Sequence, residues 1–295
     1  MGLIEGEVIF DAPMKRYTSL KVGGPADCLL FPKDLDELRK VVLHAKEKEI
    51  PLFVLGNGTN LLVLDGGIRG WVVTLRKGLR RIRKEGAYVE AEAGCGLQEL
   101  VRFSFRHGLT GFEPFFGIPG TVGGGLAMNA GAWGEEMGDV VRSVSFMDEA
   151  GEVVERPRTE LRFAYRRLDF PSTWIILKSS FHLEKGDKQK IHDRMTSFYE
   201  RRKRTQPLDY PSAGSIFKNP EEGPAGKWIE ESGLKGFRIG EAMVSEKHAN
   251  FIINLGRAKA EEVLRLIEEI ERRVYEEKGI RLKREVKVVG EASWS

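Results

Sequence analysis

Glycines are concentrated in one eighteen-residue stretch near the middle of the chain. Seven of the residues in GIPGTVGGGLAMNAGAWG (117–134) are glycine. A flexible linker combines glycine with polar residues, whereas this stretch combines it with residues that favour burial, such as Val122 and Leu126. Because ordering glycine costs backbone entropy, an ordered stretch of this kind indicates positive φ angles or close approach of the backbone to another group. That group could be a bound cofactor or a crossing segment of the chain.

A second glycine loop, GNGTN (56–60), follows a predicted buried strand at 51–55. Successive backbone N–H groups in such a turn can cradle phosphate oxygens, and Thr59 and Asn60 add side-chain donors. The loop is not a dinucleotide fingerprint, because Leu61 stands where the third glycine would be and a strand follows instead of a helix. Taken alone, the loop fits a tight structural turn equally well.

Together, the two glycine-rich segments fit one long ligand with a diphosphate in its middle. A flavin dinucleotide is such a ligand. Gly123 and Gly124 would let the backbone approach it closely. Asn129 and Trp133 would contact its polar and stacking parts.

A third loop, PSAGSIFKNP (211–220), places Ser215 directly after a glycine. It does not have the GxSxG pattern of a hydrolase nucleophile, so we expect Ser215 to act as a hydrogen-bond or proton donor. A hydroxyl is a weak acid, and its proton acceptor would have to be strongly basic, such as a carbanion or enolate. Arg166 would stabilise that anion, and Glu285 would hydrogen-bond the intermediate or relay a proton. Surface ion pairs are the alternative role for Arg166 and Glu285.

Helices and strands are predicted along the whole chain without a regular alternation, which favours an α+β fold over a doubly wound sheet. The change from a basic helix at 187–207 to a proline-rich loop predicts a domain boundary near 200–212. The clearest helix is expected at 259–279, and a single strand is expected at 282–290.

The overall charge and the cysteines exclude several classes of protein. The 47 basic and 44 acidic residues leave a net charge of +3, which is too balanced for a nucleic-acid binder. The two cysteines show no metal-ligand spacing and fit a reducing compartment, and no apolar run approaches the length of a membrane span. We therefore expect a cytoplasmic protein with no metal, nucleic acid or membrane as partner.

Seven motifs, spread in order over about residues 16–290, carry a resemblance to a known family. They are YTSLKVGGPAD (17–27), VLGNGTNLLV (54–63), GIPGTVGGGLAMNAGAWG (117–134), YRR (165–167), PSAGSIFKNP (211–220), GLKGFRIGEAMVSEKHANFIIN (233–254) and REVKVVG (284–290). With these motifs, the chain resembles the UDP-N-acetylenolpyruvoylglucosamine reductases, flavoenzymes of early peptidoglycan synthesis.

The resemblance implies an architecture. The family has an FAD-binding region of the vanillyl-alcohol-oxidase (PCMH) type in two subdomains, followed by an α+β substrate domain. Carried over, the FAD-binding region covers 17–186, with subdomains of about 17–80 and 81–186. A basic helix and connector at 187–210 leads to the substrate-binding domain at 211–290.

The resemblance also implies a reaction. NADPH would reduce noncovalently bound FAD, and a hydride would then pass to C3 of the enolpyruvyl group of UDP-N-acetylglucosamine enolpyruvate. Ser215 matches the serine that protonates C2, and Arg166 and Glu285 match the two residues that steady the enolate.

Further site residues follow from the same motifs. The cofactor-binding residues would be Gly56, Asn57, Gly58, Thr59, Asn60, Gly120, Thr121, Gly123, Gly124 and Asn129. The substrate-binding residues would be Tyr165, Lys203, Arg204, Lys218 and Asn219. The interval 167–214 holds a predicted strand and a basic helix in place of an extra tyrosine-bearing loop, which is typical of the shorter (type II) branch. We expect a monomer.

Two alternatives remain at this point. One is a related FAD-dependent oxidase of a small alcohol or sugar; such enzymes often attach the flavin through a histidine or cysteine, and GNGTN has neither. The other is a non-catalytic nucleotide-binding module, which would not need Ser215, Arg166 and Glu285 together.

Overall fold

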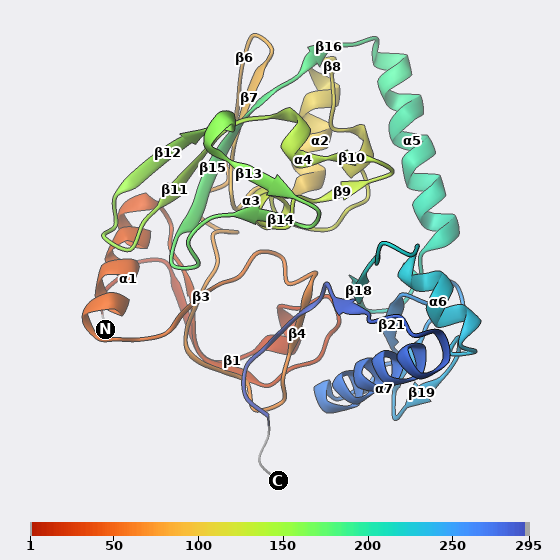
Figure 1. The fold of residues 1–295 in the computed structure, drawn as a ribbon. Helices are drawn as coiled ribbons and strands as arrows, with labels where there is room; N and C mark the ends of the chain where they lie inside the picture. The colour runs from red at the N-terminus through yellow and green to blue at the C-terminus, as the bar shows by residue number, and fades with distance from the viewer. Residues whose placement is uncertain (1, 293–295) are drawn as a thin grey trace. The chain divides into compact units, whose positions relative to one another are not determined.

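A computed structural model describes residues 2–292 as a mixture of helices and mainly antiparallel sheets (Figure 1). Helices do not alternate regularly with parallel strands, so the predicted α+β class is confirmed. The helices are α1 (Leu35–Glu47), α2 (Leu97–Arg106), α3 (Val122–Ala127), α4 (Met137–Val140), α5 (Lys188–Thr205), α6 (Ala225–Glu231) and α7 (Ala260–Lys278).

The chain forms two compact units and passes between them several times. Unit 1 comprises the chain up to Ile9, Cys28–Asn57 and Gly70–Arg201, and unit 2 comprises Phe10–Asp27, Gly58–Arg69 and the chain from Arg202 onward. The boundaries fall inside β1 (Glu7–Pro13), β2 (Pro25–Phe31) and β5 (Ile68–Val73), which belong with β3 (Leu52–Val54) to a sheet of order β1-β2-β5-β3.

Unit 1 is built on a five-stranded antiparallel sheet of order β12-β11-β15-β7-β6. Its strands are β6 (Ile82–Glu85), β7 (Tyr88–Glu92), β11 (Val141–Met147), β12 (Val153–Pro157) and β15 (Ile175–His182). Shorter antiparallel pairs are formed by β8 (Leu109–Thr110) with β16 (Glu184–Lys185), by β9 (Gly131–Ala132) with β10 (Glu135–Glu136), and by β13 (Arg162–Ala164) with β14 (Arg167–Asp169). Phe112, Phe146 and Phe181 are fully buried in its core, and such burial supplies most of the driving force for folding.

Unit 2 contains a four-stranded antiparallel sheet of order β17-β21-β20-β19 together with α6 and α7. The strands are β17 (Ser212–Ser215), β19 (Arg238–Ile239), β20 (Ala242–Val244) and β21 (Phe251–Asn254). The apolar positions of α7 recur at helical spacing and are buried, and Gly279 ends the helix at a φ of 70°. The helix predicted at 259–279 is therefore confirmed.

The strand predicted at 282–290 is wrong as a single element. It is two short strands, β22 (Lys283–Arg284) and β23 (Lys287–Val289), separated at Glu285 and Val286. β22 pairs with β18 (Phe217–Lys218), whereas β23 pairs in parallel with β4 (Leu61–Val63). The chain breaks at Glu285 because it changes its pairing partner there.

The compact units also divide the chain differently from the predicted domains. The segments 10–27 and 58–69 lie in the same unit as the C-terminal residues, because β4 pairs with β23. The helix α5, predicted as part of a connector at 187–210, belongs to unit 1 as far as Arg201. The functional roles assigned to the predicted domains stay predictions.

A buried carboxylate ties the N-terminal segment to α1. Glu37 is 3% exposed, and its oxygens accept hydrogen bonds from the backbone N–H groups of Glu5 (2.8 Å), Gly6 (3.2 Å) and Lys33 (2.9 Å). Burial alone would raise the pKa of this carboxyl, but the three donors outweigh it and hold the pKa below its ordinary 4.5.

We predict that Glu37→Gln lowers the free energy of unfolding by about 1–3 kcal/mol, because an amide turns an NH₂ group toward backbone donors. Since the folded pKa lies below 4.5, the contribution of Glu37 is present above pH 4.5 and disappears as pH falls through the folded pKa. Urea unfolding at pH 7 and at acidic pH measures this. Glu47→Gln, on the exposed end of α1, is the control. An equal loss in both variants at pH 7 would contradict the prediction.

Candidate functional site

The two glycine-rich segments meet within unit 1. A Cβ placed on Gly56 would lie 2.9 Å from Thr121 Oγ1 and 3.7 Å from Gly124 Cα. Thr121 caps α3, its hydroxyl accepting from Gly124 N at 3.2 Å. Only glycine at 56 allows this approach, so the backbone of the first loop runs directly beside the first turn of α3.

The α3 helix was not predicted, and its glycines have different causes. A Cβ on Gly123 would lie 2.9 Å from Ala93 Cβ, and one on Gly125 would lie 2.7 Å from Met137 Sδ. Both are therefore glycine because protein packs against them. Among the described residues, a Cβ on Gly124 would have only Thr121 Oγ1 within 4 Å, at 3.3 Å. Gly124 is therefore less tightly enclosed than Gly123 and Gly125, and its Cβ position is close only to the Thr121 hydroxyl that caps the helix.

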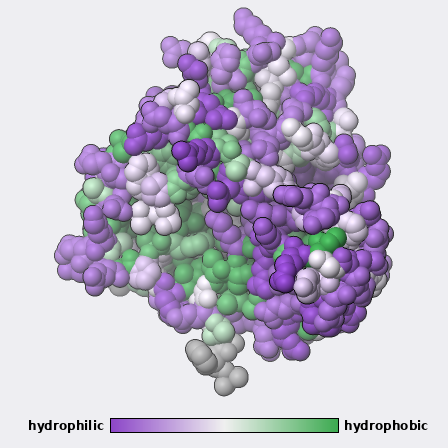
Figure 2. Space-filling model, in the orientation of Figure 1, coloured by the Kyte–Doolittle hydropathy of each residue, from purple (hydrophilic) through white to green (hydrophobic). Residues whose placement is uncertain are grey.

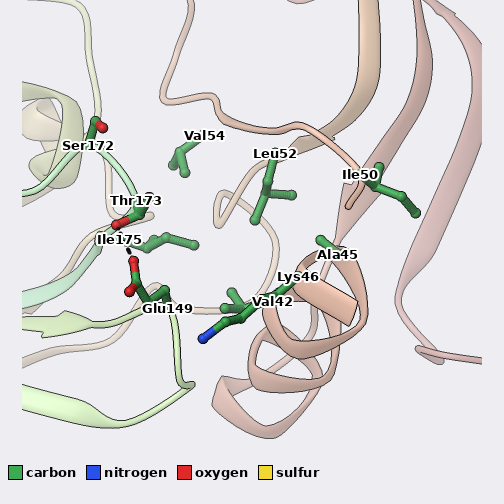
Figure 3. Close-up of a pocket in the computed structure, with 10 residues that line it drawn as sticks. All are labelled: Val42, Ala45, Lys46, Ile50, Leu52, Val54, Glu149, Ser172, Thr173 and Ile175. Atoms are coloured by element: carbon green, nitrogen blue, oxygen red, sulfur yellow. Dashed lines mark hydrogen bonds between the residues drawn. The ribbon is translucent and has the colours of Figure 1, made fainter. Parts of the chain in front are cut away.

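A pocket of about 520 Å³ lies in unit 1 beside the strand that leads to Gly56. Figure 3 shows Leu52 and Val54 of β3 pointing into it from one side and Ile175 from another, while Thr173 donates to Glu149 at 2.9 Å. The lining residues are Val42, Ala45, Lys46, Ile50, Leu52, Val54, Glu149, Ser172, Thr173 and Ile175. Figure 2 shows hydrophobic residues on this face near β3. The pocket offers apolar walls and a few polar groups, as small-molecule sites do.

The remainder of the GNGTN loop lies in unit 2. Gly58 has a φ of +62°, and a Cβ there would lie 2.2 Å from the Tyr17 carbonyl oxygen, so packing alone requires glycine. Asn60 Nδ2 donates to the Glu285 carbonyl at 3.1 Å, and the Asn60 carbonyl accepts from Lys287 N at 3.1 Å. The loop is thereby held beside Glu285.

Ser215 and Glu285 are held on neighbouring backbones in unit 2. The N–H of Glu285 donates to the Ile216 carbonyl at 2.7 Å, and Ile216 directly follows Ser215. A Cβ placed on Gly214 would lie 4.0 Å from the Thr59 carbonyl oxygen, so the residue before Ser215 lies next to the GNGTN loop. Both Ser215 and Glu285 are partly exposed. Three predicted site segments, 58–60, 214–216 and 285, therefore converge in this unit.

Arg166 lies in unit 1, in the two-residue turn between β13 and β14. Its φ of +58° is unusual for a residue with a side chain. Arg166 Nη1 donates to the Gly131 carbonyl at 3.2 Å, and its guanidinium lies 5.0 Å from the ring centre of the exposed Tyr165. Strained backbone of this kind is common at functional positions.

Asn129 has its side chain engaged by protein groups. It is 1% exposed, donates to Glu136 and to the Ala164 carbonyl (3.1 Å), and accepts from Gly138 N at 3.0 Å. Its side chain thus fixes the strand that precedes Tyr165. Direct binding of a cofactor by Asn129 stays a prediction without support from these contacts. Trp133, expected to stack on the ligand, instead stacks on Phe198 of α5.

The remaining residues predicted to bind cofactor or substrate lie in loops, at helix ends and in one short strand. Asn57 accepts from Arg76 at 3.0 Å. Gly120 accepts from Leu97 N at the start of α2. Lys203 and Arg204 lie exposed in the last turn of α5, Lys218 lies in β18, and Asn219 accepts from Ala225 N at the start of α6. Their proposed binding roles stay predictions.

Two further observations concern the described residues 2–292. They contain no group of three or more His, Cys, Asp or Glu side chains placed to hold a metal ion. None of the helices formed by these residues has the length and apolarity needed to cross a membrane.

Comparisons with known proteins agree with this geometry. A family model for the C-terminal domain of UDP-N-acetylenolpyruvoylglucosamine reductase matches residues 206–289, and a model for an FAD binding domain matches 26–156. A reductase of that name from Caldanaerobacter subterraneus subsp. tengcongensis is 49% identical over 98% of this chain and 96% of the relative. One from Syntrophus aciditrophicus is 47% identical over 98% and 94%. The chain belongs to the UDP-N-acetylenolpyruvoylglucosamine reductase family.

A solved structure extends the agreement to the fold. The reductase from Thermus caldophilus superposes with a TM-score of 0.83 at 39% identity, covering 97% of this chain and 99% of that one. The predicted FAD-binding region with a C-terminal substrate domain is confirmed for this member of the reductase family.

Sequence reasoning missed the pocket residues of this reductase and also Asn250. The pocket lining comes from α1, β3 and the segments around 149 and 172–175, and of these residues only Val54 lies in one of the seven motifs. Asn250 had a weak signal: a polar residue placed directly before the apolar strand Phe251–Asn254.

We predict different effects from two neighbouring alanine substitutions in α3. Gly123→Ala should lower the free energy of unfolding by about 1–3 kcal/mol, because its methyl group overlaps Ala93. Gly124→Ala should change the free energy of unfolding by less than about 1 kcal/mol, because the helix preference of alanine offsets the close contact of its methyl group with Thr121 Oγ1, at 3.3 Å. Urea unfolding of the FAD-free protein compares them, and equal losses would contradict our account of the glycines.

Proposed function

We propose that this protein reduces UDP-N-acetylglucosamine enolpyruvate to UDP-N-acetylmuramate with NADPH, through bound FAD, in the synthesis of peptidoglycan precursors. The observation that carries the proposal is the convergence of 58–60, Ser215 and Glu285 on one backbone junction. The relatives that share the reductase name match nearly the whole chain, which supports the same reaction here.

The described residues of unit 1 fit the ADP half of FAD. The pocket beside α1 has the apolar walls that a flat adenine ring needs, and β3 leads from it to Gly56 within two residues of Val54. There the backbone approaches Gly124, which carries no side chain to fill the space. We infer that the adenine occupies the pocket and that the diphosphate passes Gly56 and Gly124.

Bound FAD supplies the hydride-transfer chemistry, from NADPH to C3 of the enolpyruvyl group. Hydride addition at C3 leaves an electron pair at C2. The Ser215 O–H bond breaks as the C2–H bond forms, and water returns a proton to the serine oxygen. In this proposal Arg166 would bind the substrate carboxylate and Glu285 would hydrogen-bond the enolate, and each would stabilise charge that develops during the reaction.

Location and assembly are further parts of the proposal. Cys28 and Cys95 are both buried and not joined by a disulfide, which supports a reducing, cytoplasmic compartment. Burial raises the pKa of the Cys95 thiol to about 12, so it stays protonated and unreactive. That the enzyme is a monomer stays a prediction.

We predict that Ser215→Ala keeps flavin reduction by NADPH but loses most of the turnover. The hydroxyl is needed only after NADPH has reduced the flavin. Hydride addition at C3 reverses unless C2 is protonated, so the variant should keep flavin reduction and lose net reoxidation. Anaerobic visible spectra measure this: the flavin band should bleach with NADPH and return when the enolpyruvyl substrate is added to the wild type, but return slowly in the variant. Equal loss of flavin reduction would place Ser215 at the cofactor instead.

The same spectra separate the proposed reaction from its alternatives. A wild-type flavin that returns only when oxygen is admitted would indicate an oxidase. A protein that binds no flavin when FAD is supplied would contradict the cofactor assignment.

A charge in the pocket tests the position of the adenine. Val54 is 42% exposed, so Val54→Glu should leave the fold intact. We predict that it raises the Kd for FAD by about tenfold or more, because the carboxylate must be desolvated by the ring. The Kd is measured from quenching of flavin fluorescence. Val153→Glu is the matched control, a strand valine of 44% exposure that does not line the pocket. Equal affinities in the two variants would place the adenine elsewhere.

A further inference from the structure

Ser215 follows a bulge in the β17–β21 ladder. Ser212 pairs with Ile253 and Ser215 with Phe251, so three steps along one strand match two along the other. Gly214 occupies the extra position with a φ of +75°. Bulges of this kind redirect the side chains that follow them, and the direction of the Ser215 hydroxyl is therefore set by how firmly the chain after Gly214 is held.

The side chain of Asn250 holds that chain. Its Oδ1 accepts from Phe217 N at 2.9 Å, and its Nδ2 donates to the Phe217 carbonyl at 2.8 Å. The Asn250 carbonyl also accepts from Ile216 N at 2.9 Å. Asn250 is 4% exposed, and Ile216 and Phe217 are each 1% exposed, so water does not compete for these bonds.

The same short segment carries Glu285. The Ile216 carbonyl accepts from both Glu285 N (2.7 Å) and Val286 N (3.2 Å). Asn250 therefore fixes the peptide groups that set the backbone positions of Ser215 on one side and Glu285 on the other.

His248 holds the backbone at Asn250 and Phe251. Its N–H donates to His248 Nδ1 at 3.2 Å, and Phe251 N donates to the His248 carbonyl at 2.9 Å. Burial lowers the pKa of His248 and so favours the neutral ring, and the hydrogen bond from Asn250 N requires the tautomer with Nδ1 unprotonated.

We infer that Asn250 is a positioning residue for proton transfer, holding the backbone on which Ser215 delivers its proton to C2. The inference rests on the proposed role of Ser215. Asn250 touches neither substrate nor cofactor in this account. Its loss would leave hydride uptake from NADPH unchanged and slow the step that needs an aligned hydroxyl, because displacements near 1 Å cost proton transfer about 100-fold.

The test compares Asn250→Ala with Asn254→Ala in the FAD-loaded enzyme. Asn254 is a matched control: it is the last residue of β21, which Asn250 directly precedes, and it is 2% exposed. It donates to the Leu20 carbonyl (3.0 Å) and accepts from Gly256 N (2.7 Å) and Ala258 N (3.0 Å). Both variants should lose stability. Stopped-flow measurements without oxygen give the rates of flavin reduction by NADPH and of reoxidation by the enolpyruvyl substrate.

For Asn250→Ala we expect reoxidation roughly 10–100-fold slower, with flavin reduction within about twofold of the wild type. The solvent deuterium isotope effect on reoxidation should rise, because proton transfer then limits the step. For Asn254→Ala we expect both rates to be unchanged. Asn250→Ser, whose single hydroxyl cannot replace both side-chain bonds, should show a smaller slowing and provides the measurement if the alanine variant folds poorly.

Reoxidation of Asn250→Ala as fast as that of Asn254→Ala, or reoxidation of Asn250→Ser as fast as that of the wild type, would overturn the inference. Ser215→Ala is measured in parallel. If reoxidation of Ser215→Ala is not slowed, the proposed role of Ser215 fails. If reoxidation of Ser215→Ala is slow but that of the Asn250 variants is fast, the role of Ser215 stands and only the inference about Asn250 fails.

Discussion

The parallel pairing of β4 with β23 is the constraint on which the chemistry of unit 2 depends. It joins residues 61–63 to 287–289, from opposite ends of the chain. Just before both strands, Asn60 reaches the Glu285 carbonyl, across 225 positions of sequence. Glu285 in turn donates to Ile216, beside Ser215. One strand pair thus brings a glycine loop, a hydroxyl and a carboxylate onto a shared backbone framework.

Backbone proximity, more than side-chain chemistry, explains the glycines of this protein. Gly58 is required by Tyr17, and Gly123 and Gly125 by Ala93 and Met137. Gly124 is different, because its Cβ position is close only to the hydroxyl of Thr121, at 3.3 Å. Close packing of the chain therefore explains Gly123 and Gly125, and the approach of a cofactor to Gly124 stays a prediction.

Local patterns predicted the elements whose stabilising contacts lie close in sequence. The apolar spacing of 259–279 predicted α7. Local sequence patterns did not predict the elements whose conformation depends on segments far away in the sequence. Three successive glycines do not predict α3, which forms because Thr121 caps it and neighbouring segments pack closely on it. The apolar run at 282–290 does not show its break at Glu285, because the two halves pair with different strands.

The sequence by itself determined the family, the α+β class and the identity of the chemical groups, because seven motifs keep their order along the chain. It did not predict that 10–27 and 58–69 belong with the C-terminal residues, or that the side chain of Asn129 donates to Glu136 and Ala164. The position of Asn250 before an apolar strand was a weak signal that did not identify Phe217 as its hydrogen-bond partner. Only the tertiary structure decided these points. Hydrogen bonds between segments far apart in sequence depend on strand register and burial, and neither quantity is a property of a local stretch.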